Sequence, residues 1–145
     1  MEATLTITRE GSMYADFLMD SAPVGFEDCL EKSELLRRLH WGQAFAELGE
    51  PITDNLIGDP VATLRRIHCL EERNICAHVT MRVMDLSGDH LRAFFKPYGP
   101  MADKLRGLWL TNPTGLKAKF RYIQANNDEG DLTVTNIYGI DVIQN

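Results

Sequence analysis

The segment Leu116-Lys-Ala-Lys-Phe-Arg-Tyr-Ile123 carries the pattern that decides the fold. Leu116, Ala118, Phe120 and Tyr122 alternate with three cationic residues, a period of two that is typical of a strand with one buried face. The segment from Ile75 to Met84 alternates in the same way. The sequence therefore predicts a strand-rich half, from about Arg65 to Ile143, built around these two strands.

The same patterns predict the elements around these strands. Further strands are expected at Thr4–Arg9, at Thr63–Leu70, around Leu91, Ala93 and Phe95 after a Ser87–Asp89 turn, and at Leu132–Ile143. Helices are expected from Phe26, with a continuation at Gly42 that ends at Gly49 and Pro51, and at Met101–Leu110. Without a regular βαβ order, this indicates one α+β domain over residues 1–145. We expect a curled, mostly antiparallel sheet or small barrel with two or three helices.

The composition narrows the class of protein. The chain has 145 residues, 44% of them hydrophobic and 25% charged, with a net charge of −6. These are globular values, no apolar run approaches the ~20 residues of a membrane span, and Met1–Glu10 lacks a secretion signal. An odd number of cysteines argues against a disulfide framework, and the negative charge disfavours nucleic acid as a partner.

The cationic residues Lys117, Lys119 and Arg121 form the main candidate binding site. They are expected on one sheet face, where they could contact an acidic protein or phosphates, although a solvated face is the plainer interpretation. Phe120 and Tyr122 should lie on the opposite face, which argues against base stacking. An acidic group of Glu47, Glu50 and Asp54 is a candidate to pair with these cations or to bind a metal cation, without EF-hand spacing.

Cysteine and histidine residues suggest two further sites. A hairpin closed at Glu71–Asn74 would set Cys69 opposite Cys76 with His78 nearby, a ligand set that zinc accepts, although the spacing is not that of a zinc motif. Cys76 and His78 could also form a nucleophile and base. A packed sheet face is the plainer interpretation of both, so no metal or other cofactor is expected.

Several segments, in order, resemble the prohead proteases of tailed bacteriophages, which mature the capsid. Gly42–Pro51 is similar to the family's Gly-Glu-Leu-x-His-Pro element, and Ile75–Lys96 resembles its strand, Gly-Asp turn and strand. Pro97–Leu105 is similar to its helix start, and Ile137–Ile143 to its final Thr-x-Asp strand. The resemblance spans about Phe26 to Asn145 and implies the protease fold.

The catalytic positions of the family are occupied by other residues here. Glu50 stands where the family has its histidine base, and Lys119 stands in the element that carries its serine nucleophile, while Arg121 matches the family's arginine. Without a nucleophile and base, the covalent route to hydrolysis is lost. The resemblance thus implies a degenerate protease with no catalytic residues, a pseudoenzyme.

Three functional hypotheses follow from the sequence. The first is a non-catalytic bacteriophage protein that binds a capsid, scaffold or host protein, in the host cytoplasm or the virion, with a homo-oligomer as an open alternative. The second is an active serine or cysteine peptidase with displaced catalytic residues. The third is a small nucleic-acid-binding or regulatory module that uses Lys117, Lys119 and Arg121.

Overall fold

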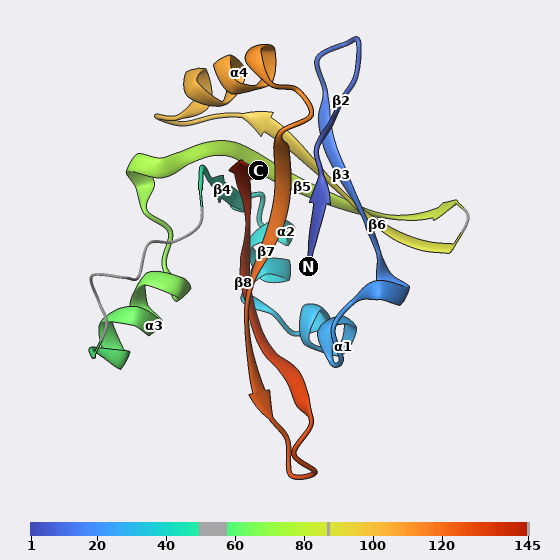
Figure 1. Cartoon of the computed structure of the whole chain (residues 1–145), viewed down its shortest axis with the longest axis vertical. Coiled ribbons are helices and arrows are strands. Elements are labelled where there is room, and N and C mark those ends of the chain that lie inside the picture. Colours follow the sequence, from blue (N-terminus) through green and yellow to red (C-terminus); the bar gives the residue numbers. More distant parts are fainter. Residues whose placement is uncertain (50–57, 87, 145) are drawn as a thin grey trace.

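The computed structural model describes residues 1–49, 58–86 and 88–144, which form two antiparallel sheets with helices around them (Figure 1). The strands are β1 (Glu2–Thr4), β2 (Thr6–Ile7), β3 (Met13–Leu18), β4 (Phe45–Glu47), β5 (Ile75–Leu86), β6 (Gly88–Pro97), β7 (Leu116–Asn126) and β8 (Leu132–Gln144). The helices are α1 (Phe26–Glu31), α2 (Glu34–His40), α3 (Pro60–His68) and α4 (Ala102–Thr111), with short 3-10 turns η1 (Met19–Ser21) and η3 (Glu72–Asn74).

The larger sheet has five strands in the order β2-β3-β6-β5-β4. Its centre is the β5–β6 hairpin, in which Val79 pairs with Phe95 and Thr80 with Phe94. β3 adds to the other side of β6. Along β6 the residues Leu91, Ala93 and Phe95 are buried and their neighbours are not, as a sheet with one core-facing side requires.

The smaller sheet has three strands in the order β1-β7-β8. β7 and β8 form a long hairpin that projects past α1 at one end of the molecule (Figure 1). The hairpin contains two register shifts, one of them between Arg121 and Tyr122. The amide of Gly49 donates to the carbonyl of Val142 at 2.7 Å, so the chain leaving β4 is attached to β8.

Local capping signals set the helix boundaries. The Ser33 hydroxyl accepts from the amide of Leu36 and donates to the carbonyl of Leu30, which separates α1 from α2. Asp59 caps α3 by accepting from the amide of Ala62, with Pro60 at the first helical position. Before α4, Gly99 has a φ of 87°, and a Cβ there would lie 2.8 Å from the carbonyl oxygen of Ile75, so only glycine fits.

The core lies between the two sheets and is closed by α1. Phe17 from β3 and Phe26 from α1 both pack edge-on against Phe120 of β7, with ring centroids 4.7 and 5.0 Å apart. All three rings are almost fully buried. Phe120 therefore joins the smaller sheet to the larger one.

The fold confirms the predicted α+β class and corrects several elements. The sheets do not close into a barrel, and the described residues contain four α-helices rather than two or three. The strands predicted at Ile75–Met84, Leu116–Ile123 and Leu132–Ile143 are confirmed, as is the helix after Met101. The turn residue Ser87 lies outside the described residues.

Three predictions were wrong for identifiable reasons. Thr63–Leu70 is mostly helix α3 rather than a strand, because the Asp59-Pro60 cap outweighs the β-branched residues. The predicted helical continuation at Gly42 contains strand β4, which forms because β5 offers it an edge. No element was expected between the strand at Thr4–Arg9 and the helix from Phe26, yet this segment contains β3, whose pairing with β6 is nonlocal.

No helix of the described residues is long and apolar enough to cross a membrane.

We predict that Phe120→Ala lowers the free energy of unfolding by about 3–5 kcal/mol, because it removes a buried ring from the junction of the two sheets. Urea denaturation measures the change. Leu132→Ala, at a 53% exposed position of β8, is the control and should alter stability by about 0.5 kcal/mol or less. A loss for Phe120→Ala no larger than that of the control would contradict the assigned core.

Candidate functional site

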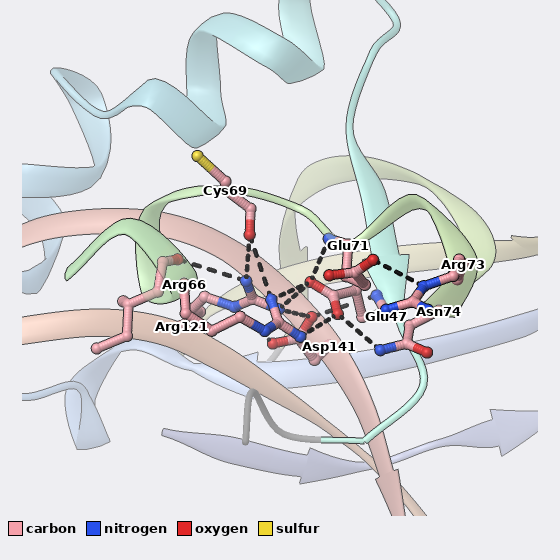
Figure 2. Close-up of polar contacts among 9 residues, drawn as sticks. Glu47, Arg66, Cys69, Glu71, Arg73, Asn74, Arg121 and Asp141 are labelled. Carbon is pink, nitrogen blue, oxygen red and sulfur yellow. Dashed lines mark hydrogen bonds and ion pairs between the residues drawn. The ribbon is translucent and has the colours of Figure 1, made fainter. Parts of the chain in front are cut away.

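Arg121 occupies the centre of a buried ionic cluster between β7, β8, β4 and α3 (Figure 2). Its Nε donates to Asp141 Oδ2 at 2.9 Å, and its Nη2 donates to Asp141 Oδ1 and to Glu47 Oε2, each at 2.8 Å. Its Nη1 donates to the carbonyls of Ile67 and Cys69 at 3.4 and 3.3 Å. All five N–H groups of the guanidinium are therefore used.

Glu47 accepts hydrogen bonds from several other groups of this ionic cluster, and its side chain is 1% exposed. Arg66 of α3 donates to both of its carboxylate oxygens, at 2.7 and 3.1 Å. The amide of Glu71 and the side chain of Asn74 donate to the same carboxylate, so the loop after α3 is fastened to it as well. The ionic cluster, defined as Glu47, Arg66, Arg121 and Asp141, thus contains two acids and two cations.

Both faces of β7 and of β4 are covered at the ionic cluster. Phe120 and Arg121 are consecutive residues and both are buried, as are Ala46 and Glu47. Consecutive residues of a strand point to opposite faces, so each of these strands has buried side chains on both sides here. The register shifts beside these pairs place the extra residue on the partner strands, β8 and β5.

Burial and charge act on the carboxyl groups in opposite directions. Burial raises the pKa of Asp141 to about 6, against the lowering effect of Arg121. Burial also tends to raise the pKa of Glu47, but hydrogen bonds from Arg66, Arg121 and the Glu71 amide hold it below its ordinary value. Glu47 is therefore the firmly ionised acid, and Asp141 is the acid of the ionic cluster that titrates at mildly acidic pH.

The chemistry of the ionic cluster indicates a structural role. Its donors and acceptors satisfy one another, and no buried side-chain polar atom of the described residues lacks a hydrogen-bond partner. It contains no hydroxyl or thiol, which rules it out as a site of covalent catalysis by serine or cysteine. Its effect is to join α3 and the 69–74 loop to both sheets.

The three cationic residues predicted on one sheet face differ in their exposure to solvent. Arg121 was expected at the solvated sheet face and is instead 7% exposed, because Glu47 of β4 and the carbonyls of Ile67 and Cys69 cover it there. Lys117 and Lys119 remain partly exposed, and Lys117 lies 3.7 Å from Glu2. The suggested pairing of Glu47 with the cations is confirmed through Arg121. Glu50 and Asp54 lie outside the described residues.

The Cys69, Cys76 and His78 arrangement does not form. Cys69 is exposed at the end of α3, Cys76 is buried in β5, and the hairpin that would have set them opposite each other is replaced by the helix. The Nε2 of His78 lies 2.9 Å from the carbonyl oxygen of Gly42. No group of three His, Cys, Asp or Glu residues suited to a metal ion occurs in the part of the chain that the structure describes.

Two members of the ionic cluster were missed by the sequence patterns. Arg66 fell in a segment interpreted as a strand, and its role depends on α3. Asp141 is an acid inside the apolar run from Ile140 to Ile143, and this lone charge was the available signal. A charged residue in a buried strand requires a partner, which the sequence does not identify.

The position expected for the family's nucleophile is placed on β7. Lys119 lies opposite Asp141 in the β7–β8 register and opposite Glu2 in the β1–β7 register. The position expected for the histidine base, Glu50, follows Gly49, the last residue described before the gap. The Gly49 amide is bonded to Val142, next to Asp141 in β8.

Comparison with known proteins bears on the fold. The arrangement of sheets and helices is a prohead-protease-like fold. The chain is similar to the structure of the bacteriophage T4 capsid assembly protease, gp21, with a TM-score of 0.57, 10% identity, and coverage of 100% of this chain and 90% of that one. No protein-family model and no curated protein matches the sequence. At this identity the likeness concerns the fold alone.

We predict that Arg121→Met lowers the free energy of unfolding by about 3–5 kcal/mol, because Glu47 and Asp141 would remain buried without their shared cation. Urea denaturation measures the loss. Arg106→Met, which removes an exposed partner of Asp103, is the control and should change stability by about 1 kcal/mol or less. Combining Arg121→Met with Asp141→Leu should recover part of the loss. Equal effects of the Arg121 and Arg106 variants would contradict the structural role.

The raised pKa of Asp141 predicts a pH dependence of defined sign. Between its ordinary value of 3.8 and about 6, the folded state binds the proton more tightly than the unfolded state. The stabilisation from this group is therefore full below pH 4 and falls by about 3 kcal/mol as pH rises through 6. The pKa of Glu47 is lowered, so the stabilisation from this group is lost as pH falls through its folded-state pKa.

Asp141→Asn isolates this contribution. The stability of the variant relative to the wild type should increase from pH 4 to pH 7, because only the wild type must ionise a buried carboxyl. Urea denaturation across this range measures the difference, with Asp103→Asn on α4 as the matched control substitution. A difference that does not change with pH would show that Asp141 does not titrate in this way.

Proposed function

We propose that this protein is a non-catalytic bacteriophage protein with the fold of a capsid-assembly protease, and that it acts by binding a protein in head assembly or a host target. The observation that carries the proposal is the pairing of Lys119 with Asp141 on β7 and β8. A lysine stands where the resemblance expects the nucleophile, and two residues later Arg121 is committed to the buried ionic cluster. In this proposal the protein keeps the protease-like fold, and a lysine replaces the nucleophile.

The displaced-peptidase alternative has less support. A cysteine nucleophile acts as the thiolate, and burial raises the pKa of Cys76 to about 12. Burial also raises the pKa of Cys29. The hydroxyl of Ser33 is used in capping α2. These groups are unsuited to attack on a peptide bond at neutral pH.

The likeness in fold guides the choice of partner. The bacteriophage T4 protein is a capsid assembly protease, and a protein with a similar fold but without the reacting groups would act by binding. We therefore propose a capsid, scaffold or host protein as partner, with action in the host cytoplasm or the virion. Homo-oligomerisation is compatible with this role, and the proposed mode of action needs no cofactor.

A reactivity assay tests the catalytic half of the proposal. The purified protein should neither cleave scaffold-like or unfolded substrates nor react with a fluorophosphonate or a thiol-reactive probe at a buried residue. The bacteriophage T4 protease serves as the positive control for cleavage. Labelling that disappears in Cys76→Ala, together with substrate turnover, would overturn the proposal in favour of a peptidase.

A binding assay with purified capsid and scaffold proteins tests the other half. We predict saturable binding that weakens about tenfold in Lys117→Glu/Lys119→Glu, because both residues lie partly exposed on β7 and can meet acidic groups. Arg121 is left intact because its substitution is predicted to destabilise the fold. Lys104→Glu, exposed on α4, is the charge-matched control. Absence of binding to either protein would contradict a role in head assembly.

A further inference from the structure

The side of the five-stranded sheet that faces away from the core carries an unusual set of residues. Alternation along β3, β5 and β6 buries Met13, Ala15, Val79, Ala93 and Phe95, so their neighbours face outward. We define the outer sheet face by these outward residues: Phe45, Tyr14, Asp16, His78, Thr80, Arg82, Arg92, Phe94 and Lys96. Thr80, Arg82 and Lys96 are exposed, and the rings are half-buried.

Aromatic rings and cations alternate with one another on the outer sheet face. The rings of Tyr14 and Phe94 are neighbours, with centroids 6.3 Å apart. The guanidinium of Arg92 lies 4.1 Å from the Tyr14 ring centroid, and that of Arg82 lies 5.7 Å from the Phe94 centroid. Beside them, Phe45 contacts the ring of His78 at 5.4 Å and stacks on Tyr98 at 5.4 Å. Rings and positive charges therefore share one surface.

The outer sheet face is also basic within an acidic chain. The whole sequence has a net charge of −6, yet Asp16 is the only carboxylate among the residues that define this face. Asp16 is already held by Arg92 through two hydrogen bonds of 2.6 and 2.9 Å. Arg82 and Lys96 form none of the ion pairs found among the described residues, so their charge is available to an anion.

A hollow opens beside this surface. It has a volume of about 390 Å³ and is bordered by the β2–β3 turn at Gly11 and Ser12 and by the outward residues His78, Thr80, Phe94 and Lys96. This volume lies in the range of small ligand pockets. The hollow places an aromatic ring, a hydroxyl, an imidazole and a cation around one space.

We propose that the outer sheet face binds single-stranded nucleic acid. Proteins that bind single strands combine a cationic surface, which follows the phosphates, with aromatic side chains on which bases stack. Arg82 and Lys96 would contact phosphates, Phe94 and Tyr14 would stack on bases, and Arg92, fixed by Asp16, would hold the Tyr14 ring in place. The face has few aliphatic residues, and this favours nucleic acid over a protein partner, whose interface would be more apolar.

This inference differs from the expectation drawn from β7. There the cations and the rings were predicted on opposite faces, which argued against stacking on bases. On the outer sheet face the cations come from β5 and β6 and the rings from β3, β4 and β6. Only the pairing of these strands brings them together. The proposal is independent of the proposed protein partner.

Fluorescence anisotropy with labelled oligo(dT) and oligo(U) of about 15 nucleotides tests the proposal on the full chain. The wild type should bind at low salt, and its affinity should fall as salt rises. Phe94→Leu, which removes the ring and keeps apolar volume, should weaken binding about fivefold or more. Lys96→Glu should weaken binding and reduce the slope of log affinity against log salt by about 0.7.

Matched controls separate the site from general effects of charge and packing. Lys32→Glu, an exposed charge reversal after α1, and Tyr138→Leu, a ring on β8, should leave affinity within about twofold of the wild type. Absence of binding at low salt would overturn the proposal. Equal weakening by Lys32→Glu and Lys96→Glu, or equal competition by polyglutamate, would also overturn it, because either result indicates attraction to charge alone.

Discussion

The burial of one guanidinium is the constraint on which the rest of this structure depends. Arg121 cannot be deprotonated, so its burial requires that every N–H group find an acceptor. The acceptors come from β8, β4 and the end of α3, and Glu47 extends the same network to Arg66 and the 69–74 loop. Segments distant in sequence are thereby fixed around a single side chain. α3, which has no buried residue of its own, is attached to the sheets by this network and by the ring contact of His68 with Tyr138.

A buried ionic network of this kind specifies geometry more than it adds stability. Apolar residues of similar volume often stabilise a fold as well as a buried ion pair does, whereas removal of one partner is strongly destabilising. The ionic cluster joins β4, β7 and β8 through hydrogen bonds from one guanidinium. Phe120, on the other face of β7, adds the apolar contact between the two sheets. The two sides of β7 therefore fix the molecule through different forces.

The likeness to a capsid assembly protease concerns the backbone fold. In an enzyme the reaction depends on a few side chains, and the remaining residues maintain the fold that positions them. Here Arg121, which the resemblance matches to the family's arginine, is engaged in structural contacts. A fold that keeps its frame can carry another function on a different surface. The surface proposed for such a function is the outer face of the larger sheet, which is built on the paired strands β5 and β6 and lies opposite the core.

The sequence by itself determined the elements whose own residues contain the signal. The alternation in β5, β7 and β8 and the amphipathic start of α4 were readable because burial on one face imposes a period of two or of 3.6 residues. The unpaired charge of Asp141 in an apolar strand was also visible, although its partner was not. Only the tertiary structure decided β4 and the burial of Arg121, because an edge strand and the groups that cover a side chain depend on neighbours distant in the chain. The same reason applies to the outer sheet face, where strands separated by about half the chain must pair before their rings and cations meet.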